Sequence, residues 1–251
     1  EAVGIFDHEL YYEEDKSAVT IANSIHLDRK LIKQKEIEGF DPKTFLIGGC
    51  RSLSSVKTMI DFIEEISHGG EVRLIIIDIN KEALDKIDIH KIKAQSNIKL
   101  EIFQGDLINL RSKIESSSVD YIRMDYTQNF IPQNQQLSLL KELNRILSDK
   151  GIASSMLHMM PAAKNFSQKL DRFREKDKGS RVDILSTYYH YGYDHFIPSE
   201  EFLKDCARKS GFKISFVDKI NNPKYRQEKL AVFEKQPRRN NFTLLKSSLI
   251  K

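Results

Sequence analysis

Two short apolar runs joined by a glycine turn and a helix decide the fold of this chain. The first run, Thr44-Phe45-Leu46-Ile47, is followed by Gly48-Gly49-Cys50-Arg51-Ser52. A helical pattern then continues to Gly69-Gly70, and a second apolar run, Val72 to Ile77, ends on Asp78. Polar ligand groups bind at the start of such a helix, and a carboxylate after the second strand accepts hydrogen bonds from ribose hydroxyls. The stretch therefore predicts a nucleotide-binding strand–turn–helix–strand unit.

Apolar runs and helical patterns continue to alternate after this unit. Val72 to Ile77 is apolar at nearly every position, which is typical of a strand buried on both faces of a parallel sheet. The alternation predicts a doubly wound α/β fold. Besides the opening unit, the predicted elements are helices at residues 81–88 and 139–147 and strands at residues 98–103, 119–124 and 152–157.

The pattern changes toward the end of the chain. Ser199-Glu200-Glu201 begins a helix with acidic residues in its first turn, and the helix stops at Gly211. Two strands follow, Phe212 to Val217 and Leu230 to Phe233, with no helix between them. Consecutive strands without a crossover helix pair antiparallel. The sequence therefore predicts seven strands, of which the last two form an antiparallel pair.

Three segments flank or interrupt this α/β domain, which we predict at residues 44–235. Residues 1–43 have apolar residues at helical spacing and predict a helical cover on one edge of the sheet. A second interpretation is a lid, with Tyr11 or Tyr12 closing over a ligand. An insertion at about residues 160–198 holds a cluster of histidines and tyrosines, and residues 236–251 form a basic tail.

Composition excludes several function classes. The chain has 251 residues and a net charge of +4, but five basic residues lie between Lys235 and Lys251, so residues 1 to 234 carry −1. Charge alone thus indicates no nucleic-acid groove. No apolar run approaches the ~20 residues of a membrane helix. Cys50 and Cys206 show neither metal-ligand nor disulfide spacing, which predicts no metal site and a reducing, cytoplasmic compartment. The oligomeric state is left open.

The order of these elements resembles the class I S-adenosylmethionine-dependent methyltransferases over about residues 40 to 235. The resemblance implies a seven-stranded, mostly parallel sheet with the last strand antiparallel, beneath the N-terminal helical cover. It also implies S-adenosyl-L-methionine as the cofactor. The segments that resemble family motifs are Phe45–Ser52, Leu74–Asn80, Phe103–Leu107, Val119–Tyr126, Leu139–Gly151 and Phe196–Phe212.

Carried onto this chain, the resemblance implies a set of cofactor-binding residues. Asp78 would bind the ribose and Asp106 the adenine amino group. The set departs from the family pattern at the glycine loop, where Ile47 stands at or near the place of an acid and Arg51 follows. Arg51 could pair with the ligand carboxylate, or it could be an ordinary surface arginine. The implied residues are Gly48, Gly49, Cys50, Arg51, Asp78, Ile79, Asn80, Gly105, Asp106, Leu107, Met124, Asp125 and Tyr126.

Each acid also has a purely structural interpretation. Asp78 could cap the helix that begins at Lys81, and Asp106 could belong to a solvated Gly-Asp turn. Likewise, the histidine and tyrosine cluster could be an aromatic cover packed on the core.

The acceptor pocket is predicted from histidines and tyrosines. His158, His195 and Tyr188 are the candidates for a catalytic base, which is needed only if the acceptor loses a proton. The residues predicted to contact the substrate are Tyr12, His158, Tyr188, His190, Tyr193 and His195.

The sequence favours a small-molecule acceptor and leaves other functions open. Asp125-Tyr126-Thr127-Gln128 stands where an Asn-Pro-Pro-Tyr signature would mark methylation of amino groups on nucleobases or proteins. The alternatives are an aminopropyl or aminocarboxypropyl transferase that uses a related donor, and a non-catalytic scaffold with the same fold. A nicotinamide dehydrogenase is disfavoured because no Gly-x-Gly-x-x-Gly is present.

Overall fold

The structure is a computed structural model, and it describes most of the sheet and the helices that cover it. The described residues are 25, 27–36, 39–49, 53–68, 70–85, 87, 97–159, 196–218 and 228–236.

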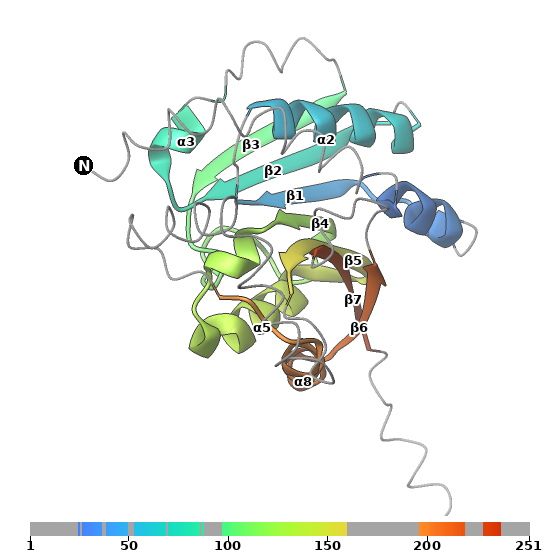
Figure 1. The fold of residues 1–251 in the computed structure, drawn as a ribbon. Helices are drawn as coiled ribbons and strands as arrows, with labels where there is room; N and C mark the ends of the chain where they lie inside the picture. Colours follow the sequence, from blue (N-terminus) through green and yellow to red (C-terminus); the bar gives the residue numbers. More distant parts are fainter. Residues whose placement is uncertain are drawn as a thin grey trace, which may run out of the picture.

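Seven strands form one sheet in the order β3-β2-β1-β4-β5-β7-β6 (Figure 1). The strands β1 to β5 pair in parallel, and β7 is antiparallel to both of its neighbours. The predicted fold class is therefore confirmed. The strands are β1 (Thr44–Gly48), β2 (Val72–Asp78), β3 (Ile98–Gln104), β4 (Val119–Asp125), β5 (Leu147–His158), β6 (Phe212–Asp218) and β7 (Glu228–Lys235).

Helices cover both faces of the sheet: α2 and α3 lie on one face, and α5 and α8 lie on the other (Figure 1). The N-terminal helix (residues 27–36) shares the face of α2. The labelled helices are α2 (Leu53–Ile66), α3 (Lys81–Asp85), α5 (Gln136–Ile146) and α8 (Glu200–Ser210), with 3-10 turns η2 (Thr127–Phe130) and η3 (Gln133–Gln135).

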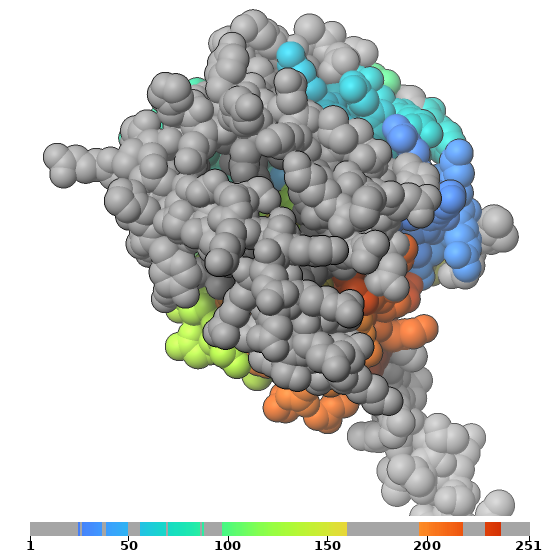
Figure 2. Space-filling view, in the orientation of Figure 1, coloured from blue at the N-terminus to red at the C-terminus, as the bar shows by residue number. Residues whose placement is uncertain are grey.

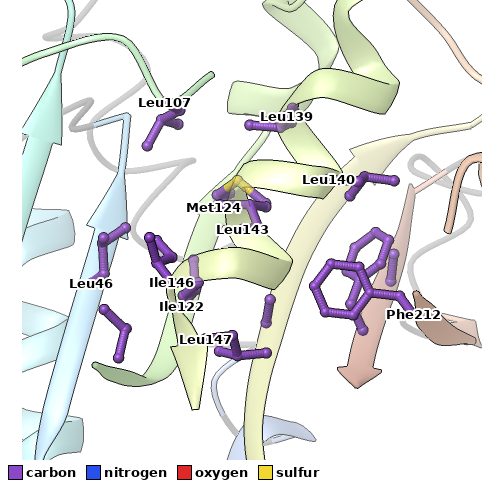
Figure 3. Close-up of a cluster of buried hydrophobic side chains, with 14 of the residues drawn as sticks. Leu46, Leu107, Ile122, Met124, Leu139, Leu140, Leu143, Ile146, Leu147 and Phe212 are labelled. Carbon is purple, nitrogen blue, oxygen red and sulfur yellow. The ribbon is translucent and has the colours of Figure 1, made fainter. Parts of the chain in front are cut away.

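Alternate residues of the central strands point into two separate cores. Phe45 and Ile47 of β1 pack toward α2, whereas Leu46 packs toward α5. Figure 3 shows the second core, in which Leu46 and Met124 lie near side chains of α5. Strand β2 behaves in the same way, with Leu74 and Ile76 in one core and Ile75 and Ile77 in the other. Its continuous apolar run is thus explained by burial on both faces.

Strand β5 differs from its prediction. The sequence predicts a helix that ends at residue 147 and a strand that starts at Ile152, with residues 149–151 as the turn between them. Instead, β5 begins at Leu147, which pairs with Val119, and the register then shifts so that Ile152 pairs with Tyr121. The turn residues therefore form an irregularity within the strand, because the pairing with β4 continues across them.

The N-terminal helix lies over the middle of the sheet rather than at its edge. Ile25 and Ile32 are buried in the core beneath α2. Arg29 pairs with Glu65 of α2 at 2.6 Å, and Lys35 pairs with Glu234 of β7 at 2.5 Å. Figure 2 accordingly shows the helix (blue) between α2 (cyan) and β7 (red). None of the helices in the described ranges combines the length and apolar character needed to cross a membrane.

Candidate functional site

The glycine turn and Asp78 are neighbours at the carboxyl edge of the sheet. Gly48 at the end of β1 pairs with Ile77 of β2 on one side and with Met124 of β4 on the other. The backbone N–H of Gly49 donates to the Ile77 carbonyl at 2.8 Å. Because Asp78 follows Ile77, the turn and the carboxylate end adjacent strands. In open parallel sheets this edge is where ligands bind.

The packing of the protein itself leaves little room for a side chain at either glycine of the turn. Gly49 has a φ of +80°, and a Cβ there would lie 1.9 Å from Oγ1 of Thr127. The same Oγ1 donates to the Gly48 carbonyl at 2.8 Å. A Cβ on Gly48 would lie 2.8 Å from Leu107. The sequence interpretation assigned this space to a ligand and missed Thr127, because nothing in the local pattern connects Thr127 to a turn 78 residues earlier.

Asp78 is not the cap of the following helix. Its Oδ1 accepts a hydrogen bond from the backbone N–H of Asn80 at 2.7 Å. It is Asn80 whose side-chain oxygen accepts from the N–H of Glu82 at 2.9 Å and so caps α3. Between them, Ile79 is 70% exposed, and among the described residues it is the large apolar side chain that stands out in solvent. An apolar surface therefore lies directly beside a half-buried carboxylate.

The end of β3 continues the same edge. The N–H of Gly105 donates to the Asp78 carbonyl at 2.9 Å, so the two strand ends are joined. Asp106 uses Oδ1 to accept from the N–H of Ile108 at 3.0 Å and forms a local turn. Leu107 is buried beneath Gly48, which leaves Asp106 as the polar residue of this segment at the edge.

The ends of β4 and β5 bring an aromatic pair to the same edge. The rings of Tyr126 and His158 stack with centroids 4.6 Å apart and an angle of 25° between planes. Tyr126 has a φ of +57°, and its N–H donates to the Met156 carbonyl. Met124, in contrast, is fully buried near α5 (Figure 3).

Buried Asn129 fixes the position of this pair. Its Oδ1 accepts from the His158 N–H at 3.0 Å, and its Nδ2 donates to the carbonyls of His158 and Phe196.

A buried group of charges lies below this edge, and the sequence interpretation missed it. Arg123 of β4 donates through Nε and Nη2 to Oδ1 of Asp125, at 2.9 and 2.6 Å. Through Nη1 it also bonds Asp28 of the N-terminal helix. The side chains of Arg123 and Asp28 are 0% exposed. The sequence feature that could have revealed these buried charges is Arg123 itself, which stands among apolar residues of a central strand.

Burial and neighbouring charges shift the pKa values of Asp28, Arg123 and Tyr121. Burial raises the pKa of Asp28 to about 6; the charge of Arg123 opposes this shift, and the charge of Asp125 adds to it. Burial works to lower the pKa of Arg123, but the carboxylates of Asp125 and Asp28 outweigh it, so the pKa lies above its ordinary value. Burial also raises the pKa of Tyr121, whose hydroxyl is 3.0 Å from Oγ of Ser154. The arrangement keeps a charged guanidinium in the core.

Most of the predicted site residues that the structure describes lie along one edge of the sheet. The structure of the described residues brings together Gly48, Gly49, Asp78, Ile79, Asn80, Gly105, Asp106, Asp125, Tyr126 and His158 along one edge. Outside the described residues lie Tyr12, Cys50, Arg51, Tyr188, His190, Tyr193 and His195.

A pocket of about 250 Å³ lies at the opposite edge of the sheet. It is lined by residues in the amino-terminal halves of β5 and β6, such as Gly151 and Lys213, so it is separate from the strand ends described above. Two of its lysines are already paired, Lys35 with Glu234 and Lys235 with Asp149. In the described ranges, no three His, Cys, Asp or Glu side chains are grouped as metal ligands.

Several solved structures that superimpose on this chain are named as methyltransferases. An O-methyltransferase family protein from Burkholderia thailandensis is 10% identical and superimposes with a TM-score of 0.59, covering 94% of this chain and 59% of that one. The CMeT domain of the citrinin polyketide synthase is 12% identical with a TM-score of 0.58, covering 78% of this chain and 47% of that one. The small RNA methyltransferase HEN1 is 17% identical with a TM-score of 0.55, covering 84% and 25%.

These likenesses show that the chain has the fold of class I S-adenosylmethionine-dependent methyltransferases. The chain spans 59% or less of the length of each of these three proteins. At the level of sequence, no protein-family model and no curated protein matches this chain.

Proposed function

We propose that this protein is an S-adenosylmethionine-dependent methyltransferase that acts on a small molecule. The observation that carries the proposal is the juxtaposition at the carboxyl edge of β1 and β2. The turn at Gly49 is hydrogen-bonded to the strand that ends on Asp78, and the exposed apolar side chain of Ile79 follows. A nucleoside needs a carboxylate for its ribose hydroxyls and an apolar surface for its base.

The residues at this edge fit the methyl donor. Asp78 would accept hydrogen bonds from the ribose, and Ile79 would cover one face of the adenine. Asp106 would accept from the adenine amino group, since Gly105 ties its turn to Asp78. The complete proposed set is Gly48, Gly49, Cys50, Arg51, Asp78, Ile79, Asn80, Gly105, Asp106, Leu107, Met124, Asp125 and Tyr126.

When bound, S-adenosylmethionine supplies the methyl group, and the chain has to align the acceptor with it. Transfer requires an in-line approach, and holding two reactants in that geometry supplies a large part of the rate. His158 stacks on Tyr126, which follows Asp125 in the chain. Of the three candidates for a catalytic base, His158 is the one that lies within the described residues. Tyr188 and His195 remain predicted candidates, and Tyr12, His190 and Tyr193 remain predicted contacts of the substrate.

Charge supports a small-molecule acceptor. Residues 1 to 234 carry a net charge of −1, which gives a polyanion little attraction to the body of the protein. The fold itself does not distinguish a small-molecule acceptor from a nucleic acid, because one of the similar structures is named as a small RNA methyltransferase.

The test is calorimetric titration with S-adenosylmethionine and S-adenosylhomocysteine. Asp78→Asn should weaken binding of either ligand by at least about 100-fold, because two hydrogen bonds to a charged group contribute about 3 kcal/mol or more. Asp61→Asn, on the exposed face of α2, is the matched control and should bind like the unmodified protein. Unchanged affinity in Asp78→Asn would remove Asp78 from the site.

A non-catalytic scaffold is the second candidate. It is favoured by Thr127, which occupies the Cβ position of Gly49 and gives the glycine turn a purely structural reason. A scaffold should show no heat of binding and no thermal shift with either ligand, or with methylthioadenosine, the probe for the aminopropyl transferases.

A further inference from the structure

One buried cation connects the N-terminal helix to the proposed donor site. Arg123 uses two of its N–H groups on Asp125, which ends β4 at the carboxyl edge, and a third on Asp28 of the helix. Asp125 remains 13% exposed, whereas Arg123 and Asp28 have no exposed side-chain surface. The three residues therefore run from the interior of the cover to the edge where ligands bind.

Holding a helix in place with buried charges costs more free energy than holding it with apolar side chains. A buried ion pair loses the hydration of both charges, and apolar residues of similar volume are often as stable or more stable. In addition, Oδ1 of Asp28 accepts no hydrogen bond within the described residues. The helix already has apolar anchors in Ile25 and Ile32 and two surface ion pairs. Docking alone does not explain the charges.

We propose that Asp28 and Arg123 are positioning residues for the methyl donor: they fix the carboxylate of Asp125 at the end of β4 and so couple the N-terminal helix to donor binding. The inference rests on the proposed function, since it assigns the donor to this edge. Coupling of this kind is reciprocal, so the ionised pair of Asp28 and Arg123 strengthens the binding of the donor, and the bound donor in turn favours the ionised pair.

The groups around Asp28 determine how its ionisation changes the position of Arg123. The groups that face it are Arg123, Asp125 and Tyr121 from β4 and Ser154 from β5, whereas Arg29 of its own helix pairs with Glu65 on the exposed side. With Asp28 ionised, the guanidinium is held from two directions by charge-assisted hydrogen bonds. With Asp28 neutral, the guanidinium is held mainly by Asp125 and is no longer anchored to the helix.

The experiment compares the unmodified chain with Asp28→Asn, which preserves the shape of the side chain and removes its charge. Affinity for S-adenosylhomocysteine is measured by calorimetry from below to above pH 6, after circular dichroism has verified that each variant is folded. Glu65→Gln is the matched control, because it breaks the exposed ion pair of the same helix and leaves the buried group intact.

We expect Asp28→Asn to weaken binding about tenfold above pH 6, within the usual range of coupling between sites. In the unmodified protein the affinity should fall as the pH drops through about 6, and in Asp28→Asn it should be independent of pH. Glu65→Gln should bind and titrate like the unmodified protein. A purely structural role would change the fraction of folded protein but not this pH profile.

Three outcomes would overturn the inference. If the unmodified protein binds no S-adenosylhomocysteine, the proposed function fails and this inference fails with it. If the unmodified protein binds but Asp28→Asn has the same affinity and pH profile, only the inference fails. If Glu65→Gln loses as much affinity as Asp28→Asn, general loosening of the helix is the cause and the role assigned to Asp28 and Arg123 is wrong.

Discussion

Gly49→Ala tests whether the glycine turn is dictated by Thr127. The added Cβ would lie 1.9 Å from Oγ1 and 2.7 Å from Cγ2 of Thr127, so that side chain has to move. Its hydrogen bond to the Gly48 carbonyl is then lost, at a cost of about 1 kcal/mol. A non-glycine residue at a φ of +80° adds about 1–2 kcal/mol. Forced displacement of packed atoms costs about 1–3 kcal/mol more.

The expected loss of unfolding free energy in Gly49→Ala is therefore roughly 3–6 kcal/mol. It is measured by urea denaturation followed by circular dichroism, because the chain contains no tryptophan for fluorescence. Gly70→Ala is the matched control: its Cβ would meet nothing closer than 3.3 Å, so it should cost less than about 1 kcal/mol.

A double-mutant cycle isolates the contact. Thr127→Gly removes the obstructing atoms, so the double variant should retain only the strain of the positive φ. The two substitutions should then be coupled by at least about 2 kcal/mol. Effects that add to within about 0.5 kcal/mol would refute the steric explanation.

The other predictions concern the buried polar groups. The pKa of Asp28 in the folded protein is about 6, above its ordinary value of 3.8. The stability that Asp28 contributes is therefore complete at low pH and is lost as the pH rises through about 6. In urea titrations, Asp28→Asn should be as stable as the unmodified protein near pH 4 and more stable by up to about 3 kcal/mol above pH 7. A crossover in the opposite direction would contradict this sign. Arg123→Met leaves Asp125 and Asp28 without their cation and should cost about 3–5 kcal/mol at pH 7, with a smaller cost at pH 4; equal costs at both pH values would count against it. Asn129→Ala removes three hydrogen bonds made by a fully buried residue and should cost about 3 kcal/mol in thermal unfolding, whereas Asn144→Ala, which removes one bond of 3.3 Å, should cost under about 1 kcal/mol.

The sheet was predictable because its signals are local and repeated. The continuous apolar run from Val72 to Ile77 predicts a strand buried on both faces, as observed. The lack of a helical pattern between Val217 and Leu230 predicts the antiparallel pair at the end of the chain, which the structure also contains. The order and spacing of the motifs also located the edge at which Gly49 and Asp78 meet. These features follow from chain periodicity and the handedness of crossovers, which act over one or two elements.

The contacts that define the site in detail were not predictable, because they join residues far apart in the chain. Arg123 and Asp28 are separated by 95 positions, and Thr127 and Gly48 by 79. Pairing across the sheet also overrode turn chemistry at residues 149–151, where the local pattern indicated the end of one element and the start of another. Tertiary pairing decides such cases.

The bonds made by Asn129 have a consequence for how this protein could change over time. One amide side chain bonds the carbonyl of His158, which ends β5, and the carbonyl of Phe196, 38 positions later in the sequence. Closing a chain between two fixed points costs only about 0.6 kcal/mol more for each doubling of its length. Chain entropy therefore sets little limit on how many residues can separate the two positions, because Asn129 holds both against the same part of the sheet.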